Sequence, residues 1–163
     1  MQPMDLRGLT ASFTVGGLAA GTTTTLSTAN TLFYSINGKA YTKTAVTNGA
    51  TPTSDAATGN AFLGCKANYG TVYVICMDSS GAFKAVQGEI TALDGSGNFI
   101  VNPELPANIP DTLCPIGYYV IKAGSTADAV TGWILGTNNS ASVTGITYTL
   151  VDINALPVRP VIS

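Results

Sequence analysis

The stretch T-L-F-Y-S-I-N-G-K-A-Y-T-K-T-A-V at residues 31–46 decides the fold class. Two runs rich in β-branched and aromatic residues flank the dipeptide Asn37-Gly38. Both central residues of a type I′ turn need a positive φ, and asparagine and glycine tolerate that conformation best. We therefore expect a β-hairpin in which residues 31–36 pair with residues 39–46.

The strand-and-turn pattern continues along the chain. A nearly continuous apolar run at 71–77, typical of a strand buried on both faces, is followed by the turn Asp78-Ser79-Ser80-Gly81 and a returning strand at 82–90. Four prolines exclude a helix from the loop at 102–115. Other turns and extended segments are expected at 94–98, 99–101, 116–122, 133–135, 138–140 and 143–153.

Residues 47–62 have two interpretations. Ser54 can cap a short helix over residues 55–62, which Gly59 weakens. The alternative is a long polar loop over residues 47–60. Strands at short spacing, separated by turns and without βαβ alternation, predict an all-β chain, an antiparallel β-sandwich or jelly-roll-like domain.

The composition of both ends of the chain predicts extended arms. Residues 16–31 are mainly Gly, Ala and Thr, and Pro157 and Pro160 favour an extended path near the other end. About ten extended residues reach roughly 33 Å, far enough to cross onto a neighbouring subunit. We therefore expect an N-terminal arm or edge segment (1–30), a β-sandwich domain (31–154) and an extended C-terminal arm (155–163).

Partner contacts are expected at these ends. Arg159 is the cation near the C-terminal end that can pair with an acidic site, although a disordered tail is the alternative. The expected partner-binding residues are Thr22, Thr23, Thr24, Thr25, Leu156, Pro157, Arg159 and Pro160.

Charged residues make up 10% of the chain and apolar residues 45%, whereas an ordinary soluble domain carries roughly 25% charged residues. A surface of Thr, Ser, Asn, Ala and Gly suits burial against neighbouring subunits.

The net charge of -2 and seven scattered Lys and Arg argue against a nucleic-acid partner. No run reaches the ~18 apolar residues of a membrane helix. The first 20 residues do not resemble a secretory signal, so we expect synthesis in the cytoplasm and no membrane partner.

The sequence contains no catalytic signature, because it has no histidine to act as a base. Cys65, Cys76 and Cys114 are expected to be buried free thiols, with a single disulfide as the alternative. No zinc motif links them, and no phosphate-binding loop occurs elsewhere. We expect no cofactor and no enzyme activity.

Carboxylates and aromatic residues are the remaining candidates for a chemical role. Asp78 and Asp94 lie in turns, where aspartate bonds its own backbone more often than it serves glycoside hydrolysis. The alternation Asp94-x-Ser96-x-Asn98 lacks the twelfth-position Glu of a calcium loop. Four of the tyrosines fall in expected strands, where core packing is the default. The residues considered for stacking on sugars are Tyr34, Tyr41, Tyr69, Tyr73, Tyr118, Tyr119, Trp133 and Tyr148.

Five segments resemble one family in their order along the chain. They are L-F-Y-S-I-N-G-K-A-Y at 32–41, A-T-P-T-S-D-A-A-T-G at 50–59, V-I-C-M-D-S-S-G-A-F-K at 74–84, P-A-N-I-P-D-T-L-C-P-I-G-Y at 106–118 and L-P-V-R-P at 156–160. Together they resemble the decoration, or cement, proteins of tailed-bacteriophage capsids. The resemblance implies a dimer or trimer on the outer capsid surface of the virion, which bridges phage major capsid proteins and stabilises the shell.

Two other function classes remain open. A tail, fibre or head-spike component with a glycan-binding role also suits Thr-, Ser- and Gly-rich β-structure. A free enzyme, of which a glycan hydrolase is the first candidate, is the third class.

Overall fold

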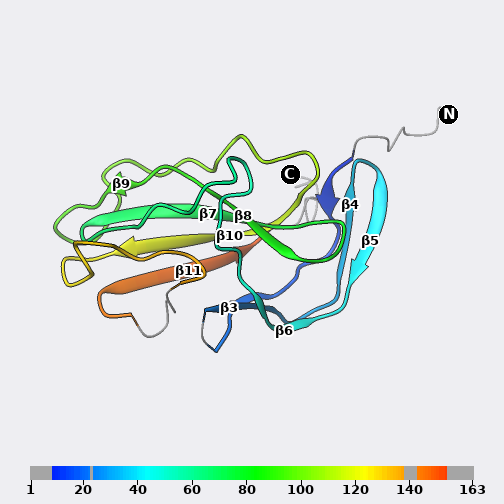
Figure 1. Ribbon diagram of the computed structural model, residues 1–163, viewed down its shortest axis with the longest axis horizontal. Helices are drawn as coiled ribbons and strands as arrows, with labels where there is room; N and C mark the ends of the chain where they lie inside the picture. The colour runs from blue at the N-terminus through cyan, green and yellow to red at the C-terminus, as the bar shows by residue number, and fades with distance from the viewer. Residues whose placement is uncertain (1–8, 23, 138–142, 154–163) are drawn as a thin grey trace, which may run out of the picture.

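The computed structural model describes residues 9–22, 24–137 and 143–153. Within these ranges the chain has no helix, and its strands pair antiparallel in three sheets (Figure 1). The predicted all-β class is therefore confirmed.

The largest sheet has five strands in the order β11-β10-β7-β8, with the short β9 paired to β7. Eight of the nine residues of β7 are buried, as the continuous apolar run predicted. The loop before β10 covers one face of β7 through Leu113, and the main core covers the other. The strand bounds are Tyr69–Met77 for β7, Phe83–Gln87 for β8, Thr91–Ala92 for β9, Cys114–Ala123 for β10 and Ile146–Asp152 for β11.

Two three-stranded sheets complete the fold, one at the end of the large sheet and one beside β11 (Figure 1). The first contains the predicted hairpin, whose turn residues Asn37 and Gly38 have φ values of 50° and 79°. Its strands are β1 (Ala11–Ser12), β4 (Leu32–Ile36) and β5 (Lys39–Lys43). The second consists of β2 (Leu18–Ala20), β3 (Thr25–Thr28) and β6 (Val46–Ala50).

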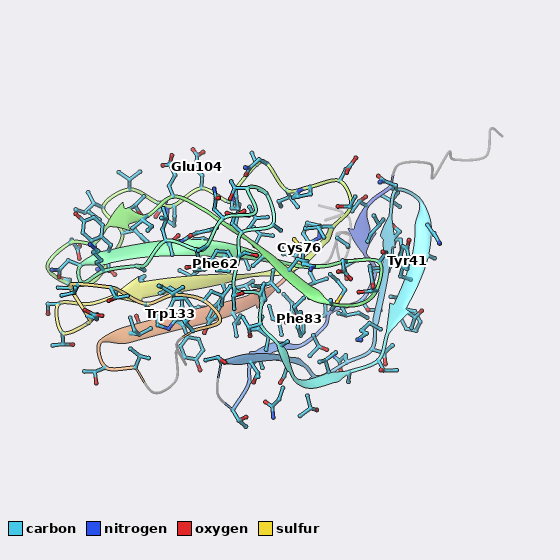
Figure 2. All side chains as sticks on the ribbon, viewed as in Figure 1. Tyr41, Phe62, Cys76, Phe83, Glu104 and Trp133 are labelled. Atoms are coloured by element: carbon cyan, nitrogen blue, oxygen red, sulfur yellow. The ribbon has the colours of Figure 1, made fainter. Side chains whose placement is uncertain are left out.

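One continuous core joins the three sheets. Leu18, Leu26 and Leu32 from the small sheets are buried with Tyr73 and Ile121 of the large one. Aromatic rings extend this core: Trp133 meets Tyr73 and Tyr119 edge to face, with centroids 5.9 and 5.8 Å apart. Phe62 and Trp133 lie within the body of the domain (Figure 2). The three cysteines are buried free thiols, as predicted.

Within the described residues, the segment expected as an N-terminal arm or edge segment (1–30) supplies edge strands, because β1 and β2 lie at the edges of their sheets. Residues 11–28 contribute β1, β2 and β3, because Leu18 and Leu26 supply buried side chains despite the Gly- and Thr-rich surroundings. The arm expected at 155–163 and the turn expected at 138–140 lie outside the described residues.

Smaller corrections concern strand limits. The helix considered over 55–62 is absent, and the alternative loop begins later than expected because residues 46–50 form β6. The extended segments expected at 99–101 and 133–135 contribute only single bridges, Leu93 to Phe99 and Cys65 to Trp133. The last strand begins at Ile146 rather than Val143.

Candidate binding groove

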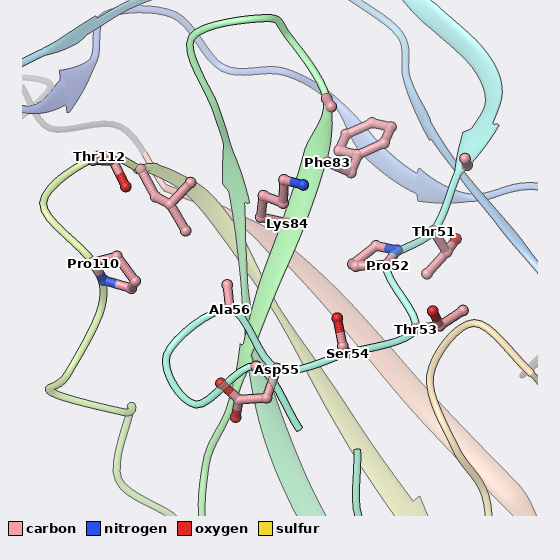
Figure 3. A pocket seen from close by; sticks show the side chains of 14 residues that line it. Thr51, Pro52, Thr53, Ser54, Asp55, Ala56, Phe83, Lys84, Pro110 and Thr112 are labelled. Atoms are coloured by element: carbon pink, nitrogen blue, oxygen red, sulfur yellow. The ribbon is translucent and has the colours of Figure 1, made fainter. Parts of the chain in front are cut away.

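A groove of about 550 Å³ lies at β8, between the loop that follows β6 and the loop that precedes β10 (Figure 3). Its lining comes from three segments far apart in sequence. These are residues 50–56 with Gly59, residues 82–84, and Pro110 with Thr112 and Leu113.

Lys84 of β8 projects into this groove (Figure 3). Its side chain is 44% exposed, and its Nζ lies 3.8 Å from Oδ2 of Asp78. Partial burial would raise the pKa of Asp78, but hydrogen bonds from the Ser80 hydroxyl and from the backbone of Ala82 and Ser80 lower it. Because the ion pair is solvated, we expect it to stabilise the fold by less than about 1 kcal/mol.

The wall formed by residues 51–56 is fixed through Asp55. Its Oδ1 accepts the backbone N–H of Ala57 at 2.7 Å, and its Oδ2 accepts that of Gln87 at 3.2 Å. The N–H of Ala56 donates to the carbonyl of Ala85 at 2.8 Å. Aspartate thus closes a turn on its own backbone and binds the turn to β8, which explains why no helix forms here.

The opposite wall is anchored from below. Leu113 packs with Val74 and Cys76 on the face of β7 that points away from the main core, and Ala56 completes this small cluster. The N–H of Leu113 also donates to the carbonyl of Pro110 at 3.1 Å. Both walls therefore rest on a shared apolar contact beneath the groove.

The threonines predicted to bind partners lie outside the groove. Thr22 and Thr24 lie in the turn between β2 and β3, and Thr25 begins β3. Oδ1 of Asn48 accepts the Thr22 N–H at 2.9 Å and the Thr25 hydroxyl at 3.2 Å. Next to Asn48, Gly49 packs directly against the ring of Phe83. Thus β6 carries both the support of the threonine turn and the start of the groove wall. The other predicted partner-binding residues, Thr23, Leu156, Pro157, Arg159 and Pro160, lie outside the described residues.

The aromatic residues do not gather into a stacking surface within the described structure. Tyr34, Tyr73, Tyr119 and Trp133 are buried in the core. Tyr148 was expected in the core but is 39% exposed, because its strand lies at the edge of the sheet.

The groove offers hydroxyl groups, the Lys84 ammonium group and the Asp55 carboxylate, whose oxygens already accept backbone N–H groups. In the part of the chain that the structure describes, no cluster of three His, Cys, Asp or Glu side chains is placed to hold a metal ion. No helix in the same ranges is long and apolar enough to cross a membrane.

Sequence reasoning missed the groove because three distant segments have to meet to form it. Each of the three belongs to a segment on which the expected family resemblance rests, at 50–59, 74–84 and 106–118. That shared membership is the signal that could have found it.

Comparison of the chain with protein-family models, curated proteins and solved structures finds no match.

Proposed function

We propose that this protein is a bacteriophage capsid decoration protein, with no enzyme activity, whose all-β domain is a β-sandwich or jelly-roll-like fold. It binds the outer surface of the head, bridges neighbouring major capsid proteins and stabilises the shell. The observation that carries the proposal is the convergence of three family-like segments on one groove.

The exposed apolar side chains support a surface that packs against other proteins. Ile100, Val101 and Leu105 are 65%, 67% and 49% exposed within one loop. Glu104 of the same loop points outward (Figure 2). Clustered exposed apolar residues mark interaction sites more often than isolated ones do.

The groove at β8 is the surface that we assign to the major capsid protein. Its hydroxyl groups and the backbone of Phe83 can bond an extended capsid segment, and Lys84 can pair with an acidic residue of that segment. Many copies of such a modest contact would strengthen a shell through avidity.

Quantitative analysis of purified virions tests the proposal. A decoration protein is expected at a copy number close to that of the major capsid protein, and it should protect heads against heat or chelation. Only a few copies per particle, with binding to host glycans, would replace the proposal with a tail, fibre or head-spike role. Turnover in a screen of glycan substrates would contradict both.

A further inference from the structure

Strand β11 forms the edge of the large sheet opposite β8. Hydrogen bonds from Gly124 to Gly145 and from Ile153 to Ile116 fix the alternation of its pairing with β10. In this alternation the odd-numbered residues of β11 bond to β10. The backbone groups of Ile146, Tyr148, Leu150 and Asp152 therefore point away from the sheet.

These outward groups are open within the described structure. No hydrogen bond among the described residues reaches the backbone N–H or C=O of Tyr148, Leu150 or Asp152. The N–H of Ile146 donates back to Val143 at 3.3 Å. An unpaired row of this kind is a template for another strand.

Among the described residues, β11 lacks the devices that usually protect an edge. It carries no lysine and no proline, and its register with β10 is unbroken over seven residues. By contrast, the edge strand β5 begins and ends with Lys39 and Lys43, and loop residues bond to the edge of β8. Natural sheets use lysines, prolines, bulges and covering loops to prevent pairing between edges.

We propose that two copies of this protein pair through β11, antiparallel about a two-fold axis at Thr149, and so join their large sheets into one. In this register the outward-facing residues meet each other, as hydrogen-bonded pairs require: Tyr148 lies opposite Leu150 of the second copy, and Ile146 lies opposite Asp152.

The strand is complementary to itself in this register. Thr149 lies opposite its own copy, and Thr147 lies opposite Val151 of the second copy. Threonine pairs and aromatic–aliphatic pairs stabilise cross-strand contacts. Asp152 is the single charged residue of β11, so no two charges face each other. An isologous contact of this type closes as a dimer rather than continuing into a fibre.

A second copy is the occupant that fits, because one strand supplies both sides of the match. The inference does not rest on the proposed function, since it follows from the edge of β11 alone. Failure of the capsid role would leave this dimer unaffected, and failure of the dimer would leave the groove at β8 available to a capsid partner.

Cysteine cross-linking in the full chain tests the register. In a non-hydrogen-bonded antiparallel pair the Cα atoms are about 4.5 Å apart, within the range that a disulfide spans. Thr149→Cys should therefore form a covalent dimer under mild oxidation. Thr147→Cys, on the same face of the same strand, is the matched control, because its copy would lie roughly 13 Å away. The native cysteines are buried and should contribute little background.

Placing like charges opposite each other in β11 provides the second test of self-association. Thr149→Lys places two ammonium groups directly opposite each other and should weaken the dimer by about tenfold or more. Thr147→Lys faces Val151 of the second copy and should have a smaller effect. Both side chains are exposed, so the fluorescence of Trp133 should remain unchanged.

Sedimentation of the wild-type chain at micromolar concentrations supplies the deciding reference. A dimer that cross-links at residue 149 in preference to residue 147 supports the proposal. A monomeric wild-type chain, or equal cross-linking at the two positions, overturns it.

Discussion

The two edges of the large sheet differ in what happens to their outward-facing backbone. At β8, Ala85 and Gln87 bond to Ala56 and Asp55 of a neighbouring loop. At β11, the described residues leave Tyr148 and Leu150 without such bonds. Under our two proposals, recognition at β8 would depend on side chains and groove shape, whereas recognition at β11 would depend on the backbone.

The difference shows how one sheet can serve two kinds of contact. A covered edge with a lined groove can select a partner by its side chains, because the loop already bonds the carbonyl of Ala85 and the N–H of Gln87. An open edge can pair with another strand through its backbone. A second copy of the same strand can pair with it about a two-fold axis, because both strands then present the same groups to each other. Four experiments test this difference between the two edges.

The largest effect is expected where the covered edge rests on buried packing. Leu113→Ala removes the apolar contact with Val74 and Cys76 and should lower the free energy of unfolding by about 2–4 kcal/mol. Leu150→Ala in the partly buried β11 should cost about half as much. Urea denaturation measures both, and a larger loss at Leu150 would reverse the assignment of covered and open edges.

The next effect concerns the loop that covers β8. Asp55→Ala removes the acceptor for the N–H groups of Ala57 and Gln87 and should cost about 1–3 kcal/mol. Hydrogen exchange should become faster at Gln87. Asp94→Ala, in an exposed turn away from β8, is the control and should leave the exchange of Gln87 unchanged. If Asp55→Ala also left it unchanged, Asp55 would not hold this edge.

Lys84→Glu should leave stability within about 0.5 kcal/mol, because the side chain is 44% exposed and its ion pair is solvated. Under the proposed function it should nevertheless reduce occupancy on capsids by tenfold or more. Lys122→Glu, at an ammonium group 5.3 Å from the ring of Phe99, tests charge alone. An equal loss of occupancy in both variants would show general electrostatic attraction rather than recognition in the groove.

The smallest effect is the dependence of stability on pH. Hydrogen bonds in the turns hold the pKa values of Asp78, Asp94 and Asp128 below their usual range. A lowered carboxyl pKa stabilises the fold above the unfolded value of roughly 4, and this contribution is lost as the pH falls through the folded value. The chain has no histidine, so the thermal midpoint should stay constant between about pH 5 and 8 and fall below about pH 4. A marked transition near pH 6 would contradict this.

Local signals explain what the sequence could predict. The turns at Asn37-Gly38 and at Asp78–Gly81 are determined by residues that accept a positive φ or bond their own backbone. The apolar run in β7 reflects burial on both faces, which is a property of the strand itself. These features need no knowledge of distant parts of the chain.

The groove and the two edges depend on which distant segments meet, so no local pattern contains them. The sequence predicts an arm or edge segment at residues 1–30, because small residues give little periodicity. Leu18 and Leu26 are the large apolar side chains that it buries among the described residues. A turn forms after Ser54 in place of a helix, because the Asp55 carboxylate accepts hydrogen bonds from the N–H groups of Ala57 and of Gln87 in β8.

The bond between Leu18 and Asp152 has a consequence for how the domain folds. The N–H of Leu18 donates to Oδ1 of Asp152 at 3.0 Å, across 134 positions of the chain. During synthesis, β2 is made long before the Asp152 carboxylate that accepts its hydrogen bond. One side of β10 stays unpaired until β11 has been made. Folding dominated by such distant pairings is slow, on the order of milliseconds to seconds for small β-proteins. The ribosome therefore has to synthesise the chain as far as β11 before β2 can form all of its native contacts.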